Sequence, residues 1–465
     1  MKLQTTPPTG SAQGFEINET FFSTTDPSGV ITAGNQVFSR TSGYELQELI
    51  GQPHNIIRHH EVPRCVFKLL WETARAGHHF IGYVKNQARN GNHYWVLAVI
   101  VPIPSGYLSV RIKPTTKLQA AVEQLYGKLL ALESAQLAAG ASEGAAATAS
   151  ATVLAAEIRK LGFPSYDAFS HHCLNEEVRS RDAEISRRQL RLFPTQLPQG
   201  STEAGLQAFF QQASVTYERL NVLVDSLAPF AAIGESIRQR KDAVEQIAED
   251  FRLNALNAHV AAHPLGAEGV IIGTVAQFLN GHANTLKGNV SALTTTIRDT
   301  TSAVTSIASN ISVARIQMEM LLSFIAEVAG RSDAGESGRL LTMARDLRNA
   351  FATTVDSAMR SISELQGRIP QVIANNEQLR KDIIYLHVAQ ISGLTEAARL
   401  REAGNFQTMF ASLRDQIESA KVQLEELGNI VGQLTQLTDR TPPQFKSIHE
   451  SLSLMQDLGD EARAV

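Results

Sequence analysis

Histidine side chains, which are common ligands of protein-bound metals, are concentrated in one segment of this chain. Neutral imidazole binds haem iron and transition metals, so the cluster indicates a haem or metal site, with exposed loop histidines as the plainer alternative. The segment has no His-x3-His or Cys-x2-Cys spacing typical of structural zinc, and we expect no bound metal. Six of the thirteen histidines lie here: His54, His59, His60, His78, His79 and His93.

Two smaller groups offer ligands elsewhere. His259 and His263 are four residues apart, which places two imidazoles on one helical face, but no third ligand is near in sequence. The run His-His-Cys at 171–173 lies near Glu176. Solvated side chains are the simpler interpretation of both groups. The chain has no Walker loop, GxSxG elbow, HExxH or GGDEF-type motif, which predicts that it is not an enzyme.

The composition predicts a helix-rich protein with little charge bias. The 465 residues carry a net charge of −4, which argues against nucleic acid as a partner. Aromatic residues make up only 6%, which suits long helices with small aliphatic seams. Cys65 and Cys173 are the only cysteines, so a disulfide framework is excluded. We find neither a signal peptide nor a run of ~18 apolar residues. We therefore expect a cytoplasmic protein without a membrane span, beginning with a disordered lead over residues 1–14.

Residues 15–113 alternate strand patterns with turn signals. Asp26-Pro27-Ser28-Gly29 and Asn90-Gly91-Asn92 are strong turn sequences. Short helices are expected between the second and third strands, including a capped one at 42–46 and another over 64–77. The pattern predicts a small α+β sheet with one face free to hold a ligand, with strands at 21–25, 30–33, 81–84, 93–99 and 107–111.

The remainder of the chain predicts helices. Residues 114–200 read as a helical linker with an Ala/Ser/Gly-rich hinge or weak helix at 139–152. Heptad seams predict an antiparallel helical hairpin over 201–330, with arms of about 60 residues. Residues 331–465 form a further helical region whose role stays open, and Pro370 is expected to kink or end its helix.

The N-terminal segment resembles the PAS domain of the aerotaxis-receptor type over residues 20–113. The resemblance rests on GYELQELIGQPHNIIRH, VKN and YWV, which occur in that order. Such domains typically hold FAD without a covalent bond and report redox state. The family's Asp is here Glu61, its preceding Pro is His60, and a usual Trp is Phe80. A PAS domain used only for dimerisation and relay is the alternative. The resemblance implies a flavin cleft lined by Asn35, Arg58, His59 and Asn86, with Arg58 pairing with a phosphate and His59 hydrogen-bonding the cofactor.

The segment IAEDFRLNALNAHVAAHPLGAEG, residues 247–269, resembles the signalling tip of bacterial chemoreceptors, within a likeness covering about 230–320. In that family the tip binds the chemotaxis kinase and its coupling protein. We expect Asn254 and Asn257 to lie in an apolar seam. Several polar family positions differ here, namely Ala261, Pro264 and Ile271-Ile272. We therefore expect a degenerate tip that keeps the hairpin without conventional kinase contact; a generic hairpin is the alternative. The resemblance implies a tip over residues 247–276, with the tip residues Leu253, Leu256, Asn257, Gly266 and Gly269.

Together these patterns predict an α+β PAS domain followed by a long all-α coiled-coil region. We expect a non-catalytic, homodimeric sensory protein related to chemotaxis or energy taxis. Its PAS domain would sense redox state or oxygen through FAD, with haem the less favoured cofactor. A non-sensing helical scaffold with a cofactor-free PAS domain is the alternative.

Overall fold

The computed structural model describes residues 6–197, 204–263, 266, 269–329, 334–399 and 404–461. The chain divides into two compact units, each built from separate stretches of sequence. The first comprises Met1–Asp225, Thr305–Met359 and Pro443–Val465, and the second comprises Ser226–Val304 and Arg360–Pro442. Within the described ranges, no helix has both the length and the apolar character needed to cross a membrane.

A five-stranded antiparallel sheet lies in the first unit, with strand order β2-β1-β5-β4-β3. The predicted turns close its hairpins. Asp26 Oδ1 accepts hydrogen bonds from the backbone N–H groups of Ser28 and Val30, and Asn90 Oδ1 accepts one from Asn92. The predicted α+β fold is confirmed. The strands are β1 (Phe21–Thr25), β2 (Ile31–Gly34), β3 (Phe80–Gln87), β4 (His93–Ile103) and β5 (Gly106–Ile112).

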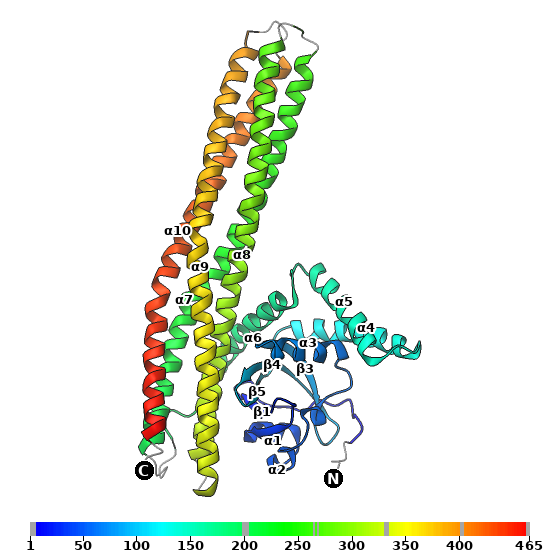
Figure 1. Cartoon of the computed structure of the whole chain (residues 1–465), viewed down its shortest axis with the longest axis vertical. Coiled ribbons are helices and arrows are strands. Elements are labelled where there is room, and N and C mark those ends of the chain that lie inside the picture. The colour runs from blue at the N-terminus through cyan, green and yellow to red at the C-terminus, as the bar shows by residue number, and fades with distance from the viewer. Residues whose placement is uncertain are drawn as a thin grey trace. The chain divides into compact units, whose positions relative to one another are not determined.

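Four short helices follow β2 and pack against this sheet (Figure 1). The side chain of Asn35 caps the first of them by accepting a hydrogen bond from the backbone N–H of Phe38. The longest begins directly after Pro63, whose ring fixes the backbone entering the helix. The helices are α1 (Gln36–Ser42), α2 (Leu46–Leu49), the 3-10 helix η1 (His54–Ile57) and α3 (Arg64–Arg75).

The described part of the predicted disordered lead is ordered by the sheet. In residues 6–14, the backbone N–H of Thr9 donates to Gly91 O at 2.9 Å, and that of Gln13 donates to His93 O at 2.6 Å. The β3–β4 turn therefore supplies backbone partners that composition alone did not reveal.

Three helices follow the sheet: α4 (Leu118–Ala138), α5 (Glu143–Lys160) and α6 (Tyr166–Arg188). Of the predicted hinge or weak helix over 139–152, only residues 139–142 are a break. The rest belongs to α5, which Ser142 caps. Glu133 of α4 is buried and accepts hydrogen bonds from the backbone N–H groups of Arg64 and Cys65 at the start of α3. The linker is thus fastened to the helices that cover the sheet.

Four long helices make up the rest: α7 (Ala204–Ala262), α8 (Val270–Ala329), α9 (Ala334–Ala397) and α10 (Gly404–Glu461). α7 and α8 have 59 and 60 residues, as the predicted hairpin requires. The C-terminal region forms a second hairpin. In the second unit one chain therefore supplies all four helices of a bundle, in the cyclic order α7-α8-α9-α10. Representative contacts between neighbours are Glu249–Lys287, Asn289–Asp382, Asn376–Leu424 and Asn254–Gln416.

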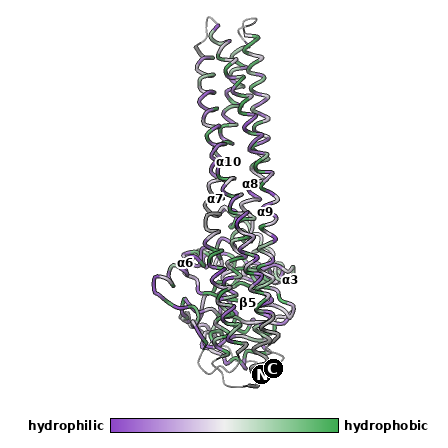
Figure 2. Tube along the Cα trace, turned by 90° about the vertical axis from the view of Figure 1, so that its left-hand side faces the viewer, coloured by the Kyte–Doolittle hydropathy of each residue, from purple (hydrophilic) through white to green (hydrophobic). Residues whose placement is uncertain are grey.

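Hydrophobic positions recur along the long helices (Figure 2), and most predicted seam residues are buried. Three details differ from the prediction. Asn257 is exposed, because it lies on the side of α7 that faces away from the buried Ala255 and Ala258. Asn254 is only half-buried. α9 continues through Pro370, which lies on an exposed face where water can satisfy the freed carbonyl. Buried seam residues include Val244, Phe251, Leu279, Leu286, Val290, Leu293, Ile307, Ile311, Leu347, Phe351, Val355, Ile362, Leu365 and Ile369.

A buried ion pair joins the sheet, α6 and α8 within the first unit. The Glu319 carboxylate accepts hydrogen bonds from both terminal nitrogens of Arg181 and, at 2.6 Å, from the Thr20 hydroxyl. Arg181 Nε also donates to the carbonyl of Ile17. Burial alone would raise the pKa of Glu319, but Arg181 lowers it below its usual value, so the carboxyl is ionised.

We predict that Glu319→Ala destabilises the first unit by about 3–5 kcal/mol, because it leaves the Arg181 charge buried without a partner. Urea unfolding followed by tryptophan fluorescence measures this selectively, since Trp71 and Trp95 both lie in the first unit. Glu184→Ala, which removes an exposed pair on α6, is the control and should leave the midpoint nearly unchanged. Equal midpoints for the two variants would contradict the prediction.

Candidate functional site

A cavity of about 340 Å³ opens between the sheet and the helices that cover it. β3, β4 and β5 form its floor, and η1 and α3 form its walls, including Phe67, Leu70 and Trp71. Its size falls in the range of small-molecule sites, and its lining is mostly apolar with a few polar groups. The structure therefore has a ligand-sized space where the sequence predicted a free sheet face.

The polar groups of this cavity centre on Arg111. Its Nη2 donates to Ser23 Oγ at 3.0 Å and lies 2.6 Å from His54 Nε2. The guanidinium lies over the rings of Phe21 and Phe38 at 5.6 and 5.4 Å. Burial first, and then the charge of Arg111, lower the pKa of His54 to about 3. His54 is therefore neutral and can accept the Arg111 hydrogen bond through Nε2.

Two buried donors in the cavity lining have no acceptor among the described residues. Asn86 Nδ2 and Arg111 Nη1 make no hydrogen bond there, although both residues are 3% exposed or less. A buried, unpaired donor costs about 1–3 kcal/mol. Such a pair of donors is the feature expected of a site completed by a ligand with matching acceptors.

The four predicted cleft residues divide into two pairs. Arg58 and Asn86 both line the cavity, and their backbones form an isolated bridge. Arg58 stacks over Phe67 at 3.9 Å and donates weakly to Val62 O at 3.4 Å. Asn35 does not line the cavity, because its side chain bonds the backbone of β1 and α1. His59 also lies outside the lining, next to His60 and Glu61.

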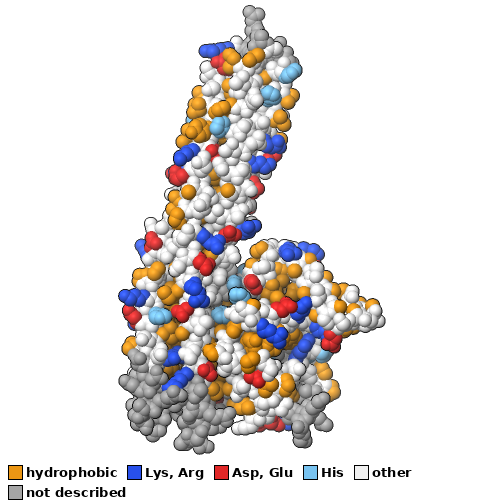
Figure 3. Space-filling view, viewed as in Figure 1, with side chains coloured by type: hydrophobic (Ala, Val, Ile, Leu, Met, Phe, Trp, Pro, Cys, Tyr) orange, Lys and Arg blue, Asp and Glu red, His pale blue; other side chains and the backbone are white. Residues whose placement is uncertain are grey.

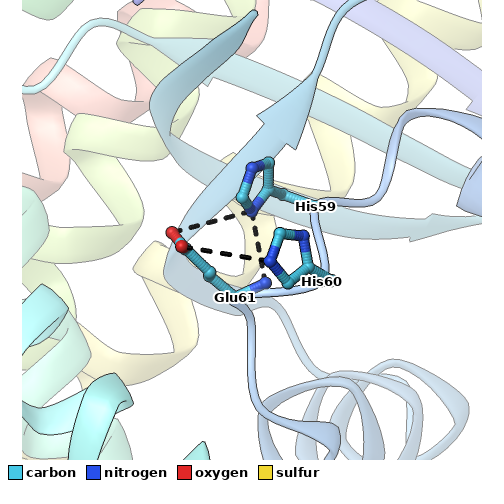
Figure 4. A group of neighbouring side chains, drawn as sticks. All are labelled: His59, His60 and Glu61. Carbon is cyan, nitrogen blue, oxygen red and sulfur yellow. Dashed lines mark hydrogen bonds and ion pairs between the residues drawn. The ribbon is translucent and has the colours of Figure 1, made fainter. Parts of the chain in front are cut away.

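His59, His60 and Glu61 form a compact cluster (Figure 4). One potential ligand atom from each lies within 4.8 Å of the others. Consecutive residues create this group, so it has none of the ligand spacings that mark a metal site in a sequence. Lys85 Nζ lies 2.5 Å from the Glu61 carboxylate, so a cation would have to compete with the lysine for that carboxylate. Burial first, and then the neighbouring His60, lower the pKa of His59 to about 4.

Elsewhere in the described residues the histidines make no further set of three possible metal ligands, although His93 lies beside His59 with ring centroids 6.0 Å apart. His79 is half-buried near His171 of α6, and desolvation lowers the pKa of His79 to about 4. His259 is exposed at the end of α7 in the second unit, with Nδ1 3.4 Å from Gly273 O. On the face drawn in Figure 3, side chains of both charges are intermixed, so surface charge does not mark a site there.

The predicted tip residues lie at the α7–α8 reversal in the second unit. Leu253, Leu256 and Asn257 are exposed, whereas Gly269 is buried. Gly266 has φ +54°, the left-handed conformation that a glycine adopts without strain. Pro264 lies outside the described residues. The described tip thus places both leucines outside the bundle core.

Sequence comparison assigns the cavity-bearing sheet to a family. The PAS fold family matches residues 31–110. These residues are a PAS domain. The chain is 47% identical to the aerotaxis receptor of Escherichia coli (strain K12) over 115 residues, which are 24% of this chain and 23% of that protein. It is 31% identical to the biofilm dispersion protein BdlA of Pseudomonas aeruginosa over 102 residues, 21% of this chain and 24% of that protein.

The match spans about a quarter of the length of these curated relatives. A solved light-oxygen-voltage domain studied with a flavin analogue is 19% identical, with a TM-score of 0.20 over 23% of this chain and 82% of that one. The resemblance to the aerotaxis-receptor PAS domain is thus confirmed, whereas the likeness of the helical region to a chemoreceptor tip stays a prediction.

We predict that His54→Asn makes the PAS domain less sensitive to acid. The pKa of His54 is about 3 in the folded chain and about 6.5 when unfolded. The unfolded chain therefore binds more protons between these values, and stability is lost as pH falls through this window. Calorimetry should show Tm falling less steeply from about pH 6.5 to about pH 5 in the variant. Asn257→Ala, at an exposed and non-titrating position in the second unit, should keep the wild-type slope. An unchanged slope in His54→Asn would contradict the prediction.

Proposed function

We propose that this chain is a non-catalytic sensory protein whose PAS domain binds a flavin, most simply FAD, and relays its redox state to the helical region. The observation that carries the proposal is the pair of buried, unpaired donors on Asn86 and Arg111 in a ligand-sized cavity. The aerotaxis-receptor resemblance implies FAD. The isoalloxazine ring is flat and apolar with carbonyl and nitrogen acceptors at its edge, which suits this lining. When bound, the flavin would supply reversible electron uptake.

The residues of the cavity have separate tasks in this proposal. Asn86 donates to a ring acceptor, and Arg111 supplies the fixed positive charge. His54, being neutral, orients the guanidinium by accepting from Nη2. Arg58, half-buried at the cavity wall, is the candidate partner for a phosphate of the cofactor. Phe67 and Trp71 restrict water in the cavity.

The first strand provides a short route from the cavity to α8. Successive strand residues face opposite sides of a sheet. Ser23 bonds Arg111 and His54 on the cavity side, while the preceding Phe22 packs edge-on against Phe324 of α8, with ring centroids 5.2 Å apart. A change in the hydrogen bonds of Arg111 would therefore act on a strand that touches α8 directly.

The partners of the helical region stay predictions. The four helices of the second unit come from one chain, so the bundle does not require a second copy to be complete. The exposed Leu253 and Leu256 offer a contact surface for a homodimer or for the chemotaxis kinase and its coupling protein, in keeping with the tip resemblance.

We predict that the purified chain, reconstituted with FAD, shows flavin absorption bands that bleach on reduction. Asn86→Ala should weaken FAD binding about tenfold, corresponding to one lost hydrogen bond to the ligand, without lowering Tm. Asn35→Ala should lower Tm through loss of the α1 cap while leaving the FAD affinity of the folded protein unchanged. Asn257→Ala, at an exposed position in the second unit, is the matched control. A chain that binds neither oxidised nor reduced FAD would refute the proposal and favour the cofactor-free scaffold.

We predict that reducing the bound flavin changes amide hydrogen exchange in residues 305–329 of α8. Phe324→Ala should retain flavin but remove this redox dependence, because the contact with Phe22 is lost. Phe278→Ala, at an exposed site in the second unit, should behave as wild type. Identical exchange in the oxidised and reduced wild-type protein would contradict the relay.

A further inference from the structure

Arg111 differs from the other buried arginines of the first unit. Arg181 and Arg315 are each paired with a carboxylate, on Glu319 and Asp182 respectively. Arg111 is just as deeply buried, at 2% exposure, but no carboxylate of the described residues forms an ion pair with it. Its polar neighbours are a serine hydroxyl and a neutral imidazole, neither of which carries negative charge.

An isolated buried cation is costly in a protein interior. Burial lowers the pKa of Arg111 to about 10, which still leaves the guanidinium charged near neutral pH. The contacts with the rings of Phe21 and Phe38 compensate part of that cost. The free Nη1 donor remains. The side chain lines the cavity, so the missing negative charge belongs to whatever occupies that cavity.

We propose that Arg111 is the counter-cation of an anionic ligand, and that the anion is the reduced flavin. This inference rests on the proposed flavin binding. Uptake of two electrons and one proton converts the neutral oxidised ring to a reduced ring with one negative charge. The electrons and the proton come from a diffusible low-potential reductant and from solvent. Arg111 therefore binds the reduced ring more strongly than the oxidised ring.

Through its charge, Arg111 shifts the reduction potential of the bound flavin, in addition to donating a hydrogen bond. A fixed cation near the ring stabilises only the state that carries negative charge, and so raises the reduction potential of the bound flavin. Asn86, which is neutral, bonds both states and sets affinity more than potential. Removing the Asn86 donor should therefore change mainly the affinity for flavin, whereas removing the Arg111 donor should change mainly its reduction potential.

The test is the midpoint potential of bound FAD in Arg111→Gln, measured by equilibration with a reference dye during enzymatic reduction. Loss of the cation should reduce the preference for reduced over oxidised flavin about tenfold, which is about 30 mV toward lower potential for a two-electron couple. Arg111→Lys keeps the charge and should stay near the wild type. Ser109→Ala, another polar change in the cavity lining, should also leave the potential unchanged.

A second measurement does not depend on a variant that removes a buried charge. In the wild type, absorption spectra of the reduced protein across a range of pH should show the bound flavin still anionic where free reduced flavin in the same buffer is already neutral. Flavin that titrates as it does in free solution would overturn the assignment, as would an unchanged potential in a flavin-retaining Arg111→Gln. Both results leave flavin binding intact, whereas failure of the wild type to bind any flavin overturns the proposed function and this inference together.

Discussion

The first unit depends on one buried carboxylate, that of Glu319. Its side chain is fully buried, and its oxygens receive hydrogen bonds from Arg181 of α6 and from Thr20 just before β1. Removing one partner of such an ion pair is costly, because the other charge stays buried without a partner and without water. The pair therefore favours one arrangement of the sheet, α6 and α8 within this unit. A purely apolar contact would permit sliding by a helical turn; this network does not.

The same helix fastens the exit of the sheet. Glu177, one turn before Arg181, accepts hydrogen bonds from the backbone N–H and hydroxyl groups of Thr115 and Thr116, and from the Tyr83 hydroxyl. The chain leaves β5 at these threonines. α6 thus holds the end of the sheet with one carboxylate and holds α8 through Arg181. Within this unit α6 therefore links the end of β5 to α8 through two side chains four residues apart, in addition to the direct contact of Phe22 with Phe324.

Local chemistry explains what could be predicted from the sequence. Turn residues such as Asp26 and Asn90 predict the hairpins, and heptad spacing predicts the long helices. Both signals depend only on residues that are near in sequence. The pairing of Glu319 with Arg181, 138 residues apart, carries no such signal, although an almost wholly buried stretch of α8 around it departs from a one-sided seam. The packing of the second hairpin against the first has no sequence signal either, because helical periodicity does not say which helices pack together.

The cavity shows the same limit of local reasoning. Resemblance supplied Arg58 and Asn86, which the structure places in the lining, but also Asn35 and His59, which it does not. The sequence carries no signal for Arg111, because its burial depends on the pairing of β5 with β1, which sets Arg111 opposite Phe21 and within reach of the Ser23 hydroxyl. Arg181 has a permanent partner, so its environment is constant. Arg111 has no carboxylate partner among the described residues, so under the proposed flavin binding its environment would follow the charge of the ligand.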